Sequence, residues 1–76
     1  MPRSREHIAL LKRLGESVQR ERLKAGLTQE KLAGSVGLYP RSLQKIEAGE
    51  INVPVTTLDR IRSVLGCKWG TLLDKP

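Results

Sequence analysis

The stretch QEKLAGSVGLYPRSLQKIEA, from Gln29 to Ala48, decides the fold of this chain. Its fifth residue, Ala33, is small, and two short helices that cross at a steep angle need a small residue where their backbones approach. Its ninth residue, Gly37, can adopt the left-handed backbone conformation that a tight turn between the helices requires. The positions that would pin the two helices together are all apolar: Leu32, Val36, Leu38, Leu43 and Ile46.

This combination of small, turning and apolar residues is the pattern of a helix-turn-helix, whose second helix enters the major groove of DNA. The charge agrees with such a partner, because 14 Lys and Arg against 8 Asp and Glu give a net charge of +6. The aromatic residues are Tyr39 and Trp69 alone, too few for the stacking platforms that bind single strands. The sequence therefore predicts double-stranded DNA as the partner.

Length and composition exclude several other classes. A chain of 76 residues predicts one small domain with a thin core. With one cysteine, Cys67, and one histidine, His7, the chain offers neither a thiolate metal cage nor a nucleophile with its base. Lys12 and Arg13 interrupt the early apolar residues before they reach the length of a signal peptide or a membrane span. We expect a cytoplasmic protein that is not an enzyme and needs no metal or cofactor.

Helical periodicity along the chain predicts an all-α fold. Thr28 is a good N-cap, Pro40 suits a first helical turn, and Gly49 is a natural stop. The first helix carries an apolar stripe of Ile8, Leu11, Leu14, Val18 and Ala25. The five expected helices cover residues 6–25, 29–36, 40–48, 57–65 and 68–73. We expect residues 1–13 to form an N-terminal extension that continues into the first helix, 14–73 the helix-turn-helix domain, and 74–76 a tail.

Arg22 lies on the stripe of the first helix, four residues after Val18. A charge buried there without a partner would be strongly destabilising. Glu47, four residues after Leu43, lies on the inward side of the third helix and is the expected partner. The sequence predicts a structural ion pair, Arg22 with Glu47, that clamps the first helix to the third.

Several motifs together resemble the Xre/Cro family of lambda-repressor-like DNA-binding domains. They are Gly26–Ala33 (GLTQEKLA), Val36–Leu38 (VGL), Ile46–Gly49 (IEAG) and the later Pro54, Leu58 and Leu65–Gly66. The resemblance extends from Leu14 to Leu73. It implies a five-helix fold in which the third helix reads bases and the second crosses the DNA backbone. It also places Arg22 and Glu47 at positions where family members form an ion pair.

The resemblance assigns DNA contacts one position at a time. Bases would be read by the outward residues of the third helix, with Arg41 able to bind both O6 and N7 of a guanine. A phosphate would be bound at the start of the second helix, where Gln29 matches the family's contact residue. Beside the resemblance, Ser42 on the third helix is a second phosphate candidate, and the connection that follows would contribute backbone amides or Asn52. The base-reading candidates are Pro40, Arg41, Gln44 and Lys45, and the phosphate candidates are Gln29, Ser42 and Asn52.

The chain departs from the family pattern at three places. Tyr39 replaces the small hydroxyl residue that often caps the recognition helix, and Pro40 replaces a polar base reader. The connection Asn52–Val55 has no cation, although this connection is often basic in the family. We expect these differences to weaken specific binding.

These observations predict a sequence-specific transcription regulator that binds double-stranded DNA, of the phage-repressor, restriction-modification-controller or antitoxin type. We expect a homodimer on a palindromic operator, with no membrane association. Its regulation is expected to come either from its concentration or from a separate regulatory protein. The dimer seam is left open between the C-terminal helix, with Trp69, Leu72 and Leu73, and the N-terminal extension, with Ile8 and Leu11.

Two alternatives belong to other classes. A protein-interaction module on the same fold, with DNA binding weakened or lost, is favoured by Tyr39, Pro40 and the uncharged connection. A helix on a membrane surface, built on residues 5–25, is disfavoured because Glu6, Glu16 and Glu21 interrupt its basic face.

Overall fold

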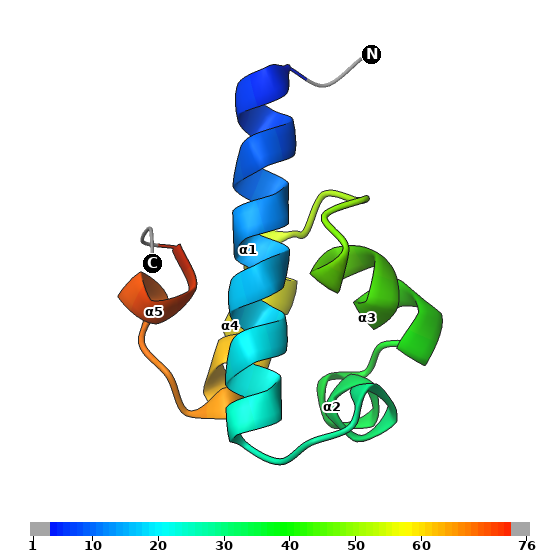
Figure 1. Cartoon of the computed structure of the whole chain (residues 1–76). Helices are drawn as coiled ribbons and strands as arrows, with labels where there is room; N and C mark the ends of the chain where they lie inside the picture. The colour runs from blue at the N-terminus through cyan, green and yellow to red at the C-terminus, as the bar shows by residue number, and fades with distance from the viewer. Residues whose placement is uncertain (1–3, 74–76) are drawn as a thin grey trace.

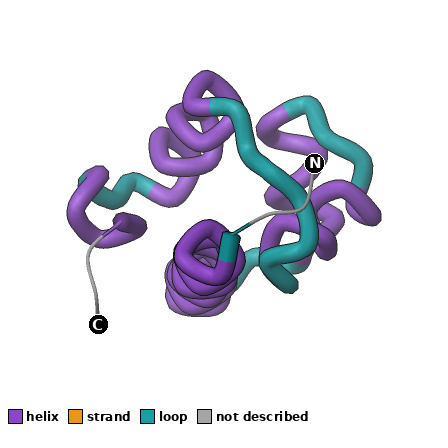
Figure 2. Tube along the Cα trace, turned by 90° about the horizontal axis from the view of Figure 1, so that it is seen from above, coloured by secondary structure: helices purple, strands orange, loops and turns teal. Residues whose placement is uncertain are grey.

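The computed structural model describes residues 4–73, and in that range it contains five α-helices and no strand. The predicted all-α fold is confirmed. In Figure 1 the long helix α1 stands between α5 on one side and α2 and α3 on the other, and Figure 2 shows α4 behind it. Residues 1–3 of the expected extension and the expected tail, 74–76, lie outside the described residues. The helices are α1 (Arg5–Lys24), α2 (Gln29–Val36), α3 (Pro40–Glu47), α4 (Val55–Leu65) and α5 (Trp69–Leu73).

Most helix ends lie within one residue of the predicted positions, but α4 begins two residues earlier than expected. Pro54 takes the N-cap position with an extended backbone, and its carbonyl accepts the N–H of Leu58 at 3.0 Å. Proline fits there because its fixed φ suits the entry into a helix. Thr57, at which the helix was expected to begin, lies inside the helix and is buried.

The core lies where α1, α2, α3 and α4 meet, and α5 closes it from the side. Ile8 and Ala25, which the predicted stripe included, are exposed. The first turns of α1 project beyond the other helices in Figure 1, and Ile8 is the fourth residue of α1, whose C-cap is Ala25. No helix in the described range is both long and apolar enough to cross a bilayer. The innermost side chains are Val18, Leu32, Ala33, Leu43, Ile61 and Leu72.

Helices α1 and α3 approach each other at a glycine. A Cβ atom added to Gly15 would lie 2.4 Å from the carbonyl oxygen of Glu47 and 2.5 Å from that of Ile46. Only a residue without a side chain therefore allows α1 to pass the last turn of α3 at this distance. This contact sets the position of α3 against the rest of the molecule, and the sequence analysis did not identify it.

Candidate nucleic-acid interface

The two helices of the motif are joined as the sequence predicts. Thr28 caps α2, since its hydroxyl accepts the backbone N–H of Lys31 at 3.1 Å. At the other end, Gly37 has a φ of 75° and its left-handed backbone reverses the chain toward α3. Ala33 is fully buried at the crossing. The turn and the small residue together hold α3 across α2 at a fixed angle.

Arg22 and Glu47 form a buried bidentate ion pair. The arginine Nε lies 2.7 Å from Glu47 Oε2, and its Nη2 donates to Oε1 at 3.2 Å. The remaining Nη1 donates to the carbonyl oxygen of Leu27 at 2.8 Å. Charge-assisted, two-pronged pairs of this kind are among the stronger hydrogen bonds in proteins. The pair joins α1, the connection to α2 and the last turn of α3.

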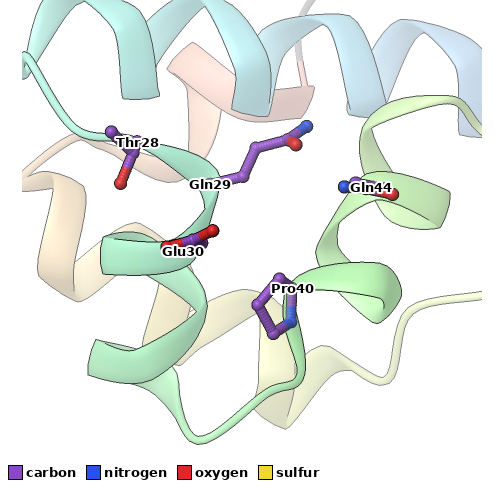
Figure 3. A pocket seen from close by; sticks show the side chains of 5 residues that line it. All are labelled: Thr28, Gln29, Glu30, Pro40 and Gln44. Atoms are coloured by element: carbon purple, nitrogen blue, oxygen red, sulfur yellow. The ribbon is translucent and has the colours of Figure 1, made fainter.

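Gln29, a phosphate candidate, is tied into the same cluster. Its Nε2 donates to Oε1 of Glu47 at 2.9 Å, and Figure 3 shows its side chain reaching from the start of α2 toward α3. One amide N–H is therefore occupied inside the molecule. Within residues 4–73 the second amide N–H and the amide oxygen of this half-buried side chain make no hydrogen bond. Sequence reasoning missed this contact because it depends on where the last turn of α3 lies.

A shallow hollow separates the start of α2 from the first turns of α3 (Figure 3). It is open to solvent and has a volume of about 340 Å³. The hollow brings the phosphate candidate Gln29 next to the base-reading candidates Pro40 and Gln44. Its lining residues are Thr28, Gln29, Glu30, Pro40 and Gln44.

The base-reading candidates share one exposed face of α3, which we call the outward face: Pro40, Arg41, Gln44 and Lys45. Within residues 4–73 the side chains of Arg41 and Lys45 form no hydrogen bond or ion pair. Ser42 is half-buried, and Asn52 lies exposed on the connection to α4. Of the predicted contacts, Gln29 and Asn52 lie outside α3, at the start of α2 and on the connection to α4.

The start of α3 differs from that of α2. Tyr39 occupies the N-cap position, makes no side-chain capping hydrogen bond, and is 81% exposed. The first turn of α3 therefore has no side-chain acceptor of its own at its positive end. This end of the helix, with Pro40 and Arg41 in its first turn, is open to an external acceptor.

A sequence profile described as helix-turn-helix matches residues 18–72. The chain belongs to the Xre-like helix-turn-helix family. Membership of this DNA-binding family makes the protein a transcription regulator rather than an enzyme. In the family's terms, α2 and α3 are the motif and α3 is its recognition helix. No curated protein sequence matches the chain.

Solved structures show the same fold. The restriction-modification controller protein C.AhdI from Aeromonas hydrophila is 28% identical, with a TM-score of 0.83 over 88% of this chain and 97% of that chain. The clp gene regulator ClgR from C. glutamicum is 26% identical, with a TM-score of 0.81 over 84% of this chain and 82% of its own. The hypothetical transcription factor NHTF from Neisseria shares the fold at 23% identity and a TM-score of 0.84, over 100% of this chain and 88% of that chain.

Proposed function

We propose that this regulator recognises one DNA sequence by placing the outward face of α3 in the major groove. The observation that carries the proposal is the set of exposed, unengaged polar side chains on that face, above all Arg41. The guanidinium of Arg41 can donate to both O6 and N7 of a guanine, and Lys45 lies one helical turn further on. Gln44 can pair with an adenine, and Pro40 can touch a thymine methyl group.

We propose that phosphates are bound beside this face. The N-terminal end of α2 offers backbone N–H groups and the free amide N–H of Gln29, which suits an anion at a helix start. Ser42 and Asn52 add contacts from α3 and from the connection that follows it. These contacts would fix the register of α3 in the groove without reading sequence.

We further propose a cytoplasmic homodimer on a palindromic operator. One α3 reads only a short half-site, whereas two copies related by a two-fold axis read half-sites about 34 to 36 Å apart. Exposure reduces the list of residues that could form either dimer seam. Trp69 and Leu73 are exposed on α5, and Ile8 is exposed on the N-terminal turns of α1. Leu72 and Leu11 are buried within the chain and so contribute little surface to a partner.

The named roles of two solved relatives support a role in gene regulation. C.AhdI is a restriction-modification controller and ClgR a clp gene regulator. We propose a role of this kind, as a restriction-modification controller, a phage-type repressor or an antitoxin-like repressor, with a separate protein adjusting its activity. Regulation would follow from operator occupancy.

Selection of bound duplexes from a random pool, followed by fluorescence anisotropy on the consensus, tests the proposal. We expect affinity to fall linearly with salt on logarithmic axes, because phosphate contacts release counterions. Arg41→Ala should relax preference at one base pair, by about 1 to 3 kcal/mol of discrimination. An equal loss on every sequence would remove Arg41 from base reading.

A second candidate, a protein-interaction module, is favoured by the exposed Tyr39 beside Pro40. An apolar docking surface of that kind would respond little to salt. Absence of a retarded duplex even in dilute buffer would favour this module over the DNA regulator.

A further inference from the structure

The connection between α3 and α4 has no positive charge of its own. Residues 48–54 carry one carboxylate, Glu50, and neither lysine nor arginine. The connection nevertheless follows the recognition helix directly and exposes Asn52. A DNA backbone presents a negative charge at every phosphate. A cation at this end of the interface must therefore come from another helix.

Helix α1 brings Lys12 to this place. A Cβ atom added to Gly49 would lie 2.8 Å from the Cα of Lys12 and 2.9 Å from its Cγ. One turn further along α1, Gly15 lies against the carbonyl oxygens of Ile46 and Glu47. The side of α1 that carries Lys12 thus packs on the last turn of α3 and the start of the connection, which Figure 1 shows beside α1.

Lys12 also continues the outward face of α3. Steps of four and three residues lead from Arg41 to Lys45 and then to Ala48, and all three are exposed. Ala48 directly precedes Gly49, against which Lys12 packs. The lysine is exposed, and its ammonium group makes no hydrogen bond or ion pair in the described part of the chain. Lys12 is therefore an exposed cation next to the end of the helix that carries Arg41 and Lys45.

We infer that Lys12 binds a backbone phosphate at the end of the DNA site that α3 reads, and supplies the cation that the connection lacks. The inference rests on the proposed DNA-binding function. A lysine suits this task because its flexible stem carries a compact charge to a phosphate without reading bases. Lys12 would therefore raise the affinity for DNA without changing the preference for one DNA sequence over another.

Lys12→Gln tests the assignment, since glutamine keeps the Cβ and Cγ atoms that lie near Gly49. Anisotropy on the selected duplex, from about 50 to 200 mM salt, should give a salt slope smaller by about one per bound subunit. Affinity at about 100 mM salt should fall roughly five- to tenfold, with unchanged preference among base substitutions. Lys12→Arg, which keeps the charge, should bind as the wild type does.

Lys68→Gln is the matched control, because it removes the same charge from an exposed residue next to α5, on the other side of α1 (Figure 1). The slope of its DNA affinity against salt concentration should equal that of the wild type. Lys12→Met, with its unbranched stem, is a second neutral variant, and thermal melting identifies whichever variant keeps the fold.

The outcomes separate this inference from the proposed function. Wild-type binding with a steep salt slope, and no difference between Lys12→Gln and Lys68→Gln, would overturn the role of Lys12 and leave the DNA regulator intact. A wild-type protein that binds no duplex would overturn both. A folded Lys12→Gln variant that alone loses one unit of slope would establish the contact.

Discussion

At the scale of single residues, one carboxylate joins the fold to the proposed DNA interface. Glu47 accepts hydrogen bonds from Arg22 and from Gln29, so it stabilises a buried charge and orients a side chain at the start of α2. The Arg22 partnership was predictable from helical spacing, because an arginine on an apolar stripe requires a counter-charge. The Gln29 contact was not, because it links two helices whose relative position no local pattern encodes.

Glu47→Ala should destabilise the protein by about 3 to 5 kcal/mol, since it leaves the guanidinium of Arg22 buried without a carboxylate. Urea unfolding measures the loss. The control is Asp59→Ala, which breaks an exposed pair with Arg62 at 2.8 Å and should change stability by less than about 1 kcal/mol. Equal losses in the two variants would mean that burial adds nothing to the Arg22 pair.

Cys67 should react slowly with alkylating agents in the folded protein. Burial disfavours its thiolate and raises the pKa of the thiol, and the nearby carboxylate of Glu21 adds to the increase. A raised pKa means a smaller thiolate fraction at any pH below it, and the thiolate is the reactive form. Iodoacetamide at mildly alkaline pH should therefore modify the native protein more slowly than the urea-unfolded protein, with a gap that narrows as pH rises. Equal rates would contradict the raised pKa.

At the scale of helices, local signals fixed α2 and α3 well. A threonine cap, a glycine in the turn and a proline in a first turn each mark a helix end through contacts and backbone preferences that involve only neighbouring residues. The start of α4 was misplaced because proline and threonine compete as entry signals over Pro54–Thr57. The close approach of α1 to α3 was missed altogether, since a glycine inside a helix does not reveal what lies opposite it.

Gly15→Ala and Gly34→Ala should shift stability in opposite directions. Alanine favours an exposed helix over glycine by about 1 kcal/mol, and a Cβ at Gly34 meets nothing within 4 Å. At Gly15 the same atom would collide with two backbone carbonyls of α3, so we expect a net loss of about 1 to 3 kcal/mol. Thermal or urea unfolding measures both. A stabilised Gly15→Ala variant would show that α1 and α3 can separate at little cost.

At the scale of the whole molecule, the interface combines what sequence can and cannot predict. The resemblance to the Xre/Cro family implied the outward residues of α3, and the structure places them in one exposed set. Lys12 is far from that helix in sequence and belongs to the segment that was expected to form an N-terminal extension. Its place beside Gly49 exists only once α1 has packed on α3.

The proposed dimer should dissociate as the protein is diluted, and sedimentation equilibrium from submillimolar to micromolar concentration measures this. Leu73→Ser and Ile8→Ser each introduce a polar group at one candidate seam, both at exposed residues. We expect one of them to weaken the dimer, because serine loses the apolar area buried there. Val55→Ser, at an exposed residue at the start of α4, is the control and should not change association. A chain that stays monomeric at every concentration would contradict the dimer.

Within residues 4–73 the exposed side chains of Arg41 and Lys45 make no hydrogen bond or ion pair, whereas Gln29 donates a hydrogen bond to Glu47. We therefore expect that substitutions at the exposed positions of α3, with Gln29 kept unchanged, can direct the regulator to a new operator. Libraries randomised at Arg41, Gln44 and Lys45 should yield mostly folded proteins with altered DNA preferences, a property that would let such a small scaffold acquire new targets by few substitutions.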